Sequence, residues 1–218
     1  MAYSFDNIFE QFLYIVDDSR FVDSMTEDIL AVTLSKYLYE AIAFFDDYCN
    51  KDLSDYTATS QTSCELTGDG STTVFSLSCS PASGSSLYVS IDETENTSYS
   101  FNEDTNEITF DSAPSTDSEI YVGAYKVGEF TNDLNIQEKI ILANAMSLPY
   151  LKFYMQKRLH LNQMVYGNEY GVHSQANQTK ENRTTYESRR KEIMQDIMMY
   201  TYKQTNDDFE GVSGANQL

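Results

Sequence analysis

Tryptophan is absent from this 218-residue chain, and histidine, cysteine and proline are scarce, at two, three and three residues. His160 and His173 lie in no HExxH pattern and beside no nucleophile signature, so hydrolytic chemistry has no recognisable motif. Cys49, Cys64 and Cys79 form no CxxC pair, and their odd number argues against a disulfide framework. We therefore expect free thiols, no metal, no cofactor and no enzymatic activity.

Long apolar runs are missing as well. No stretch approaches about 18 apolar residues, so we expect no membrane span. The first residues lack the basic and then apolar pattern of a signal peptide. The sequence thus predicts a cytoplasmic protein.

Basic residues are few over the first part of the chain, and the net charge is −20. Residues 1–126 carry 4 Lys and Arg against 23 Asp and Glu, whereas residues 127–218 carry 10 against 11. A protein that grips nucleic acid needs a basic surface, which the first part does not supply. Two interpretations stay open: the acids serve solubility, or they line a conduit through which DNA slides without adhering.

Helical periodicity is present at both ends of the chain. Apolar residues spaced by three and four predict helices over Phe5–Val16, Met25–Tyr48, Ile136–Leu161 and Ser174–Tyr202. Capping-box patterns at 24–27 and 135–138 mark two of the starts. Pro149 should kink or divide the third helix near Leu148.

The last predicted helix is long and its apolar stripe is thin, with Tyr186, Ile193, Ile197 and Tyr200 on one face. Such a helix cannot bury itself alone, so it needs other helices or other subunits. Lys203–Leu218 is polar and without periodicity, which predicts a loose tail that becomes ordered against a neighbour.

Between the helical ends, residues 57–126 are rich in Ser, Thr and Gly, and the hydrophobic period changes to two. The pattern predicts five short strands, at 73–77, 86–91, 98–101, 107–110 and 119–122. The predicted fold class is α+β: a helical bundle from residues 1–56 and 127–218, with residues 57–126 inserted as a small antiparallel β-sandwich or barrel.

Two charge clusters are candidates for binding. The carboxylates of 92–95 and 103–104 suggest calcium, but their spacing does not match an EF-hand, and a solvated loop is the alternative. The basic clusters 157–158 and 189–191 are either surface charges or contacts to an acidic partner subunit.

Several stretches resemble one protein family. They are 38–45 (LYEAIAFF), 49–54 (CNKDLS), 138–154, and 173–177 (HSQAN) leading into the long helix. Together they resemble the head–tail connector (adaptor or neck) proteins of tailed bacteriophages. The inserted segments 67–75 and 108–114 look like a small β-domain that recurs in phage structural proteins. Many adaptors are helical throughout, so this insertion departs from the wider group.

The resemblance implies a structural virion protein in the neck, assembled in the host cytoplasm. Its implied partners are the portal protein, neighbouring copies in a twelvefold ring, a tail or second neck protein, and genomic DNA that passes through the lumen without specific binding. The end of the long helix and the tail should dock onto the portal or a neighbouring copy, through Arg189, Arg190, Lys191, Tyr200, Tyr202 and Phe209.

Two other functions stay open. A tail or tail-fibre-associated protein could bind a host glycan through the β-module, although such a protein should be mostly β throughout. A metal-dependent hydrolase could use the carboxylates of the insertion, although it would lack any ligand or nucleophile pattern.

Overall fold

The structure, a computed structural model, describes residues 3–18, 21, 25–49, 51–165 and 170–213; side chains are described outside 158–165, 170–179 and 206–213. The chain divides into two compact units. The helical unit comprises residues 1–17, 36–56 and 130–218, and the β-rich unit comprises residues 18–35 and 57–129. Helix α3 (Glu27–Asp46) contributes to both, because the division falls after Ser35.

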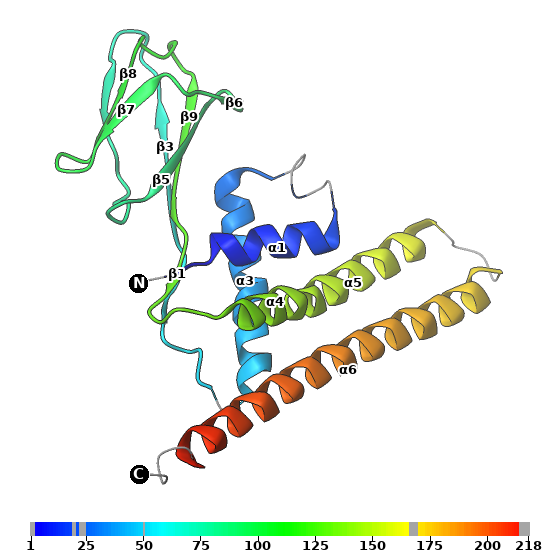
Figure 1. Cartoon of the computed structure of the whole chain (residues 1–218). Coiled ribbons are helices and arrows are strands. Elements are labelled where there is room, and N and C mark those ends of the chain that lie inside the picture. The colour runs from blue at the N-terminus through cyan, green and yellow to red at the C-terminus, as the bar shows by residue number, and fades with distance from the viewer. Residues whose placement is uncertain (1–2, 19–20, 22–24, 50, 166–169, 214–218) are drawn as a thin grey trace. The chain divides into compact units, whose positions relative to one another are not determined.

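The helical unit is built on helices from both ends of the chain: α1 (Asp6–Val16), α4 (Ile136–Ala145), α5 (Ser147–Val165) and α6 (Tyr170–Ser213), with the second half of α3. Helix α1 packs on α4, and α4 and α5 both pack on α6. Helices α5 and α6 run side by side in opposite directions (Figure 1).

Aromatic rings form much of the core of this unit. The fully buried Phe5 meets Phe130 and Tyr56 edge-on, with ring centroids 4.9 and 5.8 Å apart. About two helical turns after Phe5, the Phe12 ring meets the rings of Tyr37 and Tyr150, with ring centroids 6.1 Å apart in each pair. These contacts explain why the apolar stripe of α1 is aromatic, since each such pair adds to the stabilisation that burial provides.

The predicted start and division of the third helix are confirmed. Asn135 caps α4: its side chain accepts a hydrogen bond from the Glu138 backbone N–H, and the Glu138 carboxylate accepts one from the Asn135 N–H. The helix ends at Ala145, and α5 begins at Ser147. Pro149 lies in the first turn of α5, where its missing N–H removes no helical hydrogen bond.

Helix α6 is longer than predicted. It spans 44 residues and runs without interruption through Ser174. The predicted stripe is confirmed at Ile193, Ile197 and Tyr200, which are buried. The prediction of a loose tail from Lys203 is wrong as far as Ser213, because the backbone continues as helix; the last five residues lie outside the described part.

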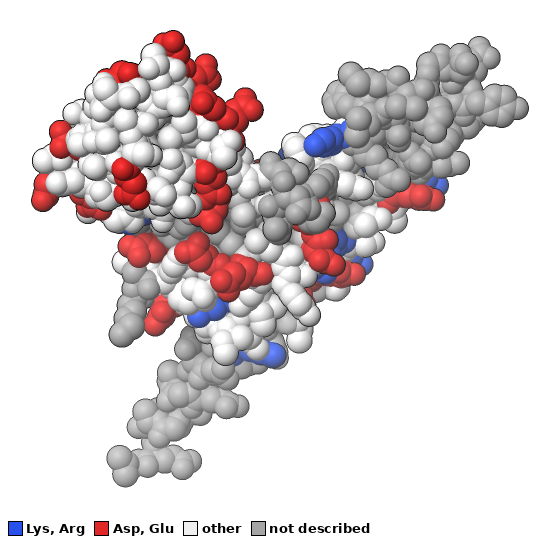
Figure 2. Space-filling model, turned by 90° about the horizontal axis from the view of Figure 1, so that it is seen from above, with Lys and Arg blue, Asp and Glu red and all other residues white. Residues whose placement is uncertain are grey.

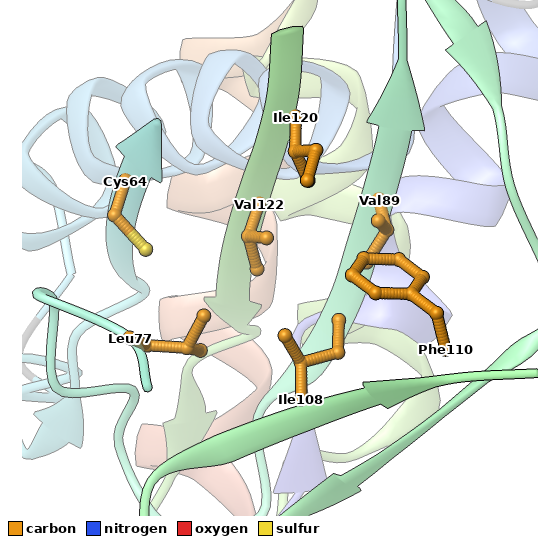
Figure 3. Packing of buried hydrophobic residues seen from close by; sticks show 7 residues of the cluster. All are labelled: Cys64, Leu77, Val89, Ile108, Phe110, Ile120 and Val122. Carbon is orange, nitrogen blue, oxygen red and sulfur yellow. The ribbon is translucent and has the colours of Figure 1, made fainter. Parts of the chain in front are cut away.

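Two antiparallel sheets form the body of the β-rich unit. One has the strand order β3-β9-β5-β6, from Ser60–Thr67, Glu119–Lys126, Ser86–Ile91 and Thr94–Glu95. The other has the order β4-β8-β7, from Val74–Ser76, Glu107–Phe110 and Tyr99–Asn102. Buried side chains from both sheets point toward one another between them (Figure 3): Cys64, Leu77, Val89, Ile108, Phe110, Ile120 and Val122.

The first turn of α3 lies on the other face of the β3-β9-β5-β6 sheet. Asp28 is fully buried there and accepts hydrogen bonds from Gln61 Nε2 at 2.9 Å and the Tyr121 hydroxyl at 3.4 Å, as well as from the Thr26 hydroxyl. A side chain at Gly123 would crowd this group, since an added Cβ would lie 3.0 Å from Asp28 Oδ2. The glycine therefore permits the close approach of helix and sheet.

The cysteine prediction is wrong for two of the three residues. Cys64 on β3 and Cys79 after β4 are joined by a disulfide, with Cα atoms 5.6 Å apart, while Cys49 is free and buried. Spacing along the sequence could not reveal this pair, because the packing of the two sheets on each other brings the cysteines together.

The predicted fold class, a helical bundle carrying one small β insertion, is also wrong. The described residues form a mixed α/β chain with ten strands in three antiparallel sheets. The third sheet, β1-β10-β2, comes from Tyr3–Ser4, Glu129–Phe130 and Tyr56–Thr57, outside or at the edge of the predicted insertion. Two-residue strands are too short to produce a period-two pattern. In addition, the first half of α3 groups with strands and not with the other helices.

Candidate interaction surface

The clearest candidate for binding is a groove between α4 and α6, here called the α4–α6 groove. It has a volume of about 280 Å³ and is lined by Gln137, Ile140, Ile141, Asn144, Asp196, Met199, Tyr200 and Lys203. Two of its apolar side chains are about half exposed to solvent: Ile140 is 47% exposed and Met199 is 59% exposed. Ile136, one turn before Ile140 on α4, is also exposed. Contiguous exposed apolar side chains of this kind mark contact surfaces more often than isolated ones do.

Tyr200, which lines the groove, also belongs to a buried polar network. The Glu138 carboxylate is fully buried and receives hydrogen bonds from the Tyr200 hydroxyl and from Lys51 Nζ, the latter at 2.5 Å. The Tyr200 hydroxyl in turn accepts hydrogen bonds from Asn135 Nδ2 at 2.9 Å and Gln204 Nε2 at 2.5 Å. Burial, and secondly the hydrogen bond to Glu138, raises the pKa of Tyr200 above its ordinary value. The network therefore ties α6 to the start of α4.

The residues predicted as an interface from the sequence lie in different environments. Tyr200 is buried, and Arg189 donates to Asn144 Oδ1 at 2.7 Å. Arg190 donates to the Tyr48 hydroxyl at 3.2 Å and lies over the Phe44 ring. Lys191 and Tyr202 are exposed on α6, and the side chain of Phe209 lies outside the described residues.

Ile140 and Met199 were not among the predicted interface residues. The sequence does carry a signal for them, since α4 has apolar residues on more than one side and Met198 and Met199 fall beside the buried stripe of α6. An apolar residue outside the core stripe is a candidate for contact with another molecule. Which of the apolar residues would face solvent could not be decided before the packing of α4 was known.

Acidic side chains dominate the β-rich unit. Residues 57–129 contain 12 Asp and Glu and one lysine. On the face shown in Figure 2 the acids are spread over this unit and do not gather in one patch. Spread of this kind is expected of charges that serve solvation.

Two of the carboxylates considered for calcium accept hydrogen bonds from other parts of the β-rich unit. Glu103 accepts hydrogen bonds from the Ser83 hydroxyl and the Gly84 N–H, both at 3.1 Å, and Asp92 accepts one from the Glu119 N–H at 2.9 Å. Within the described residues, no group of three or more His, Cys, Asp or Glu is placed to hold a metal ion. None of the helices in the described part of the chain has the length and apolar character that a membrane crossing requires.

Comparisons with known proteins leave the family open. No protein-family model matches the chain, and no curated protein matches it at a significant level.

Proposed function

We propose that the protein is a structural subunit of a tailed-phage neck, which joins neighbouring copies of itself into a ring between the portal and a tail or second neck protein. In this role it is a virion component without catalytic activity, and genomic DNA passes through the ring. The observation that carries the proposal is the α4–α6 groove. A groove with exposed apolar side chains beside a long helix suits a repeated subunit contact, because it offers apolar surface that a neighbouring copy can bury.

Charge supports the same role. A ring around DNA must not hold the phosphates, and a chain with net charge −20 offers few lysines and arginines to neutralise them. The acids of residues 57–129 could also serve solubility alone, so the groove is the stronger argument.

The test is assembly of the purified protein, alone and with its portal, followed by mass photometry and negative-stain electron microscopy. Ile140→Asp and Met199→Asp each place a charge in the α4–α6 groove and should abolish ring formation. Both residues are exposed, so the melting temperature should change little.

The chain offers a matched control in Ile29→Asp. Ile29 is 49% exposed, close to the 47% of Ile140, but belongs to the β-rich unit. This variant should assemble as the wild type does. Normal rings from both groove variants, or failure of wild type to form any ring with the portal, would overturn the proposal.

A further inference from the structure

The disulfide of the β-rich unit lies where its two sheets have unpaired edges. Strand β3 is the last strand of one sheet and β4 is the last strand of the other. Cys64 lies on β3, and Cys79 follows β4 by three residues. The bond therefore links one sheet to the other along this open side, here called the β3/β4 seam.

Each half of the seam is anchored to its own sheet without the disulfide. Strand β3 pairs with β9 over eight residues, from Ser60 to Thr67. The segment that carries Cys79 is held by Asn106, whose Nδ2 donates to the carbonyl oxygens of Leu77 at 3.0 Å and Cys79 at 2.8 Å. The Leu77 N–H completes this clamp by donating to the Asn106 carbonyl at 2.9 Å. Breaking the disulfide thus removes a link between the sheets and leaves the pairing within each sheet in place.

We propose that Cys64 and Cys79 form a redox-controlled lock on the β3/β4 seam, open as two thiols in a reducing medium and closed as a disulfide in an oxidising one. Cys64 is buried, whereas Cys79 is only partly buried, so a small thiol or disulfide reaches the pair from the Cys79 side. In the cytosol thiols are kept reduced, and outside it disulfides persist. The lock therefore closes after the protein leaves a reducing compartment.

The closing reaction is thiol–disulfide exchange with a low-molecular-weight disulfide such as oxidised glutathione. The thiolate of Cys79 attacks one sulfur of the reagent, which forms a mixed disulfide and releases one glutathione thiolate. The Cys64 thiolate then attacks the Cys79 sulfur, which forms the intramolecular bond and releases the second glutathione. The protein loses two protons and two electrons, and one glutathione disulfide becomes two thiols.

The expected consequence is local. The bond closes a loop between cysteines 15 residues apart in the sequence. A cross-link over that length restricts the opened chain enough to lower the equilibrium population of the open seam by up to the order of a hundredfold. Reduction should therefore accelerate amide hydrogen exchange in β3 and in residues 74–79, while exchange in β5 and α4 stays as it was.

The experiment uses the full chain in buffers of reduced or oxidised glutathione. Maleimide labelling with intact-mass measurement reports the number of thiols, and hydrogen exchange reports the seam. Cys49→Ser should keep the redox response, because Cys49 is free and lies in the helical unit. In the double variant Cys64→Ser/Cys79→Ser, amide hydrogen exchange at the seam should match that of the reduced protein in both buffers.

Three results would overturn the proposal. The first is that Cys64 and Cys79 stay unoxidised in oxidised glutathione. The second is amide hydrogen exchange at the seam that is equal in two samples, one of which mass measurement shows to be oxidised and the other reduced. The third is exchange that rises throughout the β-rich unit on reduction, because the disulfide would then maintain the whole unit and not the seam. If the double variant does not fold, wild type in the two buffers still decides between these results.

Discussion

The ion pair of Lys51 with the buried Glu138 should contribute strongly to stability, and the two residues should be energetically coupled. Glu138 is fully buried, and its carboxylate satisfies three donors: the Asn135 N–H, the Tyr200 hydroxyl and Lys51 Nζ. Glu138→Gln keeps the shape of the side chain but removes the charge, and it turns one acceptor into a donor that faces other donors. Removing one partner of a buried pair costs about 3–5 kcal/mol, and because Lys51 can reach water we expect the lower value, about 3 kcal/mol.

Lys51→Met tests the other partner. The Lys51 side chain is 31% exposed, so its loss leaves a buried carboxylate that still has the Tyr200 and Asn135 donors. We expect a loss of about 2 kcal/mol in the free energy of unfolding. The double variant should lose about 1–2 kcal/mol less than the sum of the two single losses, because the second change removes a charge that the first left unpaired.

The measurement is urea unfolding followed by helical circular dichroism, which reports mainly on the helical unit. Glu187→Gln is the control, since Glu187 pairs with Arg183 on the exposed side of α6 and such pairs add little stability. A Glu138→Gln variant within about 0.5 kcal/mol of wild type, or additive single losses, would refute the reasoning.

Three further predictions use other contacts. Gly123→Ala should destabilise the protein by about 1–3 kcal/mol, because its Cβ would press on Asp28, and thermal unfolding measures this loss. Tyr200 keeps its hydroxyl proton in the folded state at pH values where the unfolded chain, with a pKa of about 10, has lost it. Its contribution is therefore present below about pH 10 and declines as pH rises further, so Tyr200→Phe should show a shallower decline in urea titrations above that pH. Finally, fluorescence anisotropy should detect no duplex-DNA binding at physiological salt; micromolar binding that weakens steeply with salt would contradict this.

Sequence patterns predicted the parts of the fold that depend on local periodicity. The Asn135–Glu138 capping box and the buried stripe of α6 are confirmed, because each is set by residues within a few turns of one helix. The strands at 86–91 and 107–110 are found at the predicted positions for the same reason.

The errors arise where distant residues decide the outcome. Strand β3 was missed because its sequence, SQTSCELT, is mostly polar; its place at a sheet edge requires few apolar residues. The Cys64–Cys79 pair and the buried Asp28 also depend on long-range contacts that no spacing encodes. The same holds for the candidate interaction surface: Ile140 and Met199 are apolar like their buried neighbours, and only the packing of α4 on α6 leaves them exposed.

The middle of α6 carries the last prediction. The helix spans 44 residues, or about 66 Å. Its side chains are described from residue 180, and the first buried one after that point is Ile193. Between 180 and 192 the side chains are exposed or half-buried. The hydroxyls of Thr184 and Thr185 donate to carbonyl oxygens one turn earlier, and such hydrogen bonds slightly destabilise a helix. Helices that bury little of their surface are marginal in water, so amides of residues 180–188, which precede the Arg189 and Arg190 contacts, should exchange quickly in the isolated protein. If this stretch forms a second contact between ring subunits, in addition to the α4–α6 groove, its exchange should slow on assembly. Slow exchange in the isolated chain would contradict the marginal stability, and fast exchange in the assembled ring would exclude the middle of α6 from the contact.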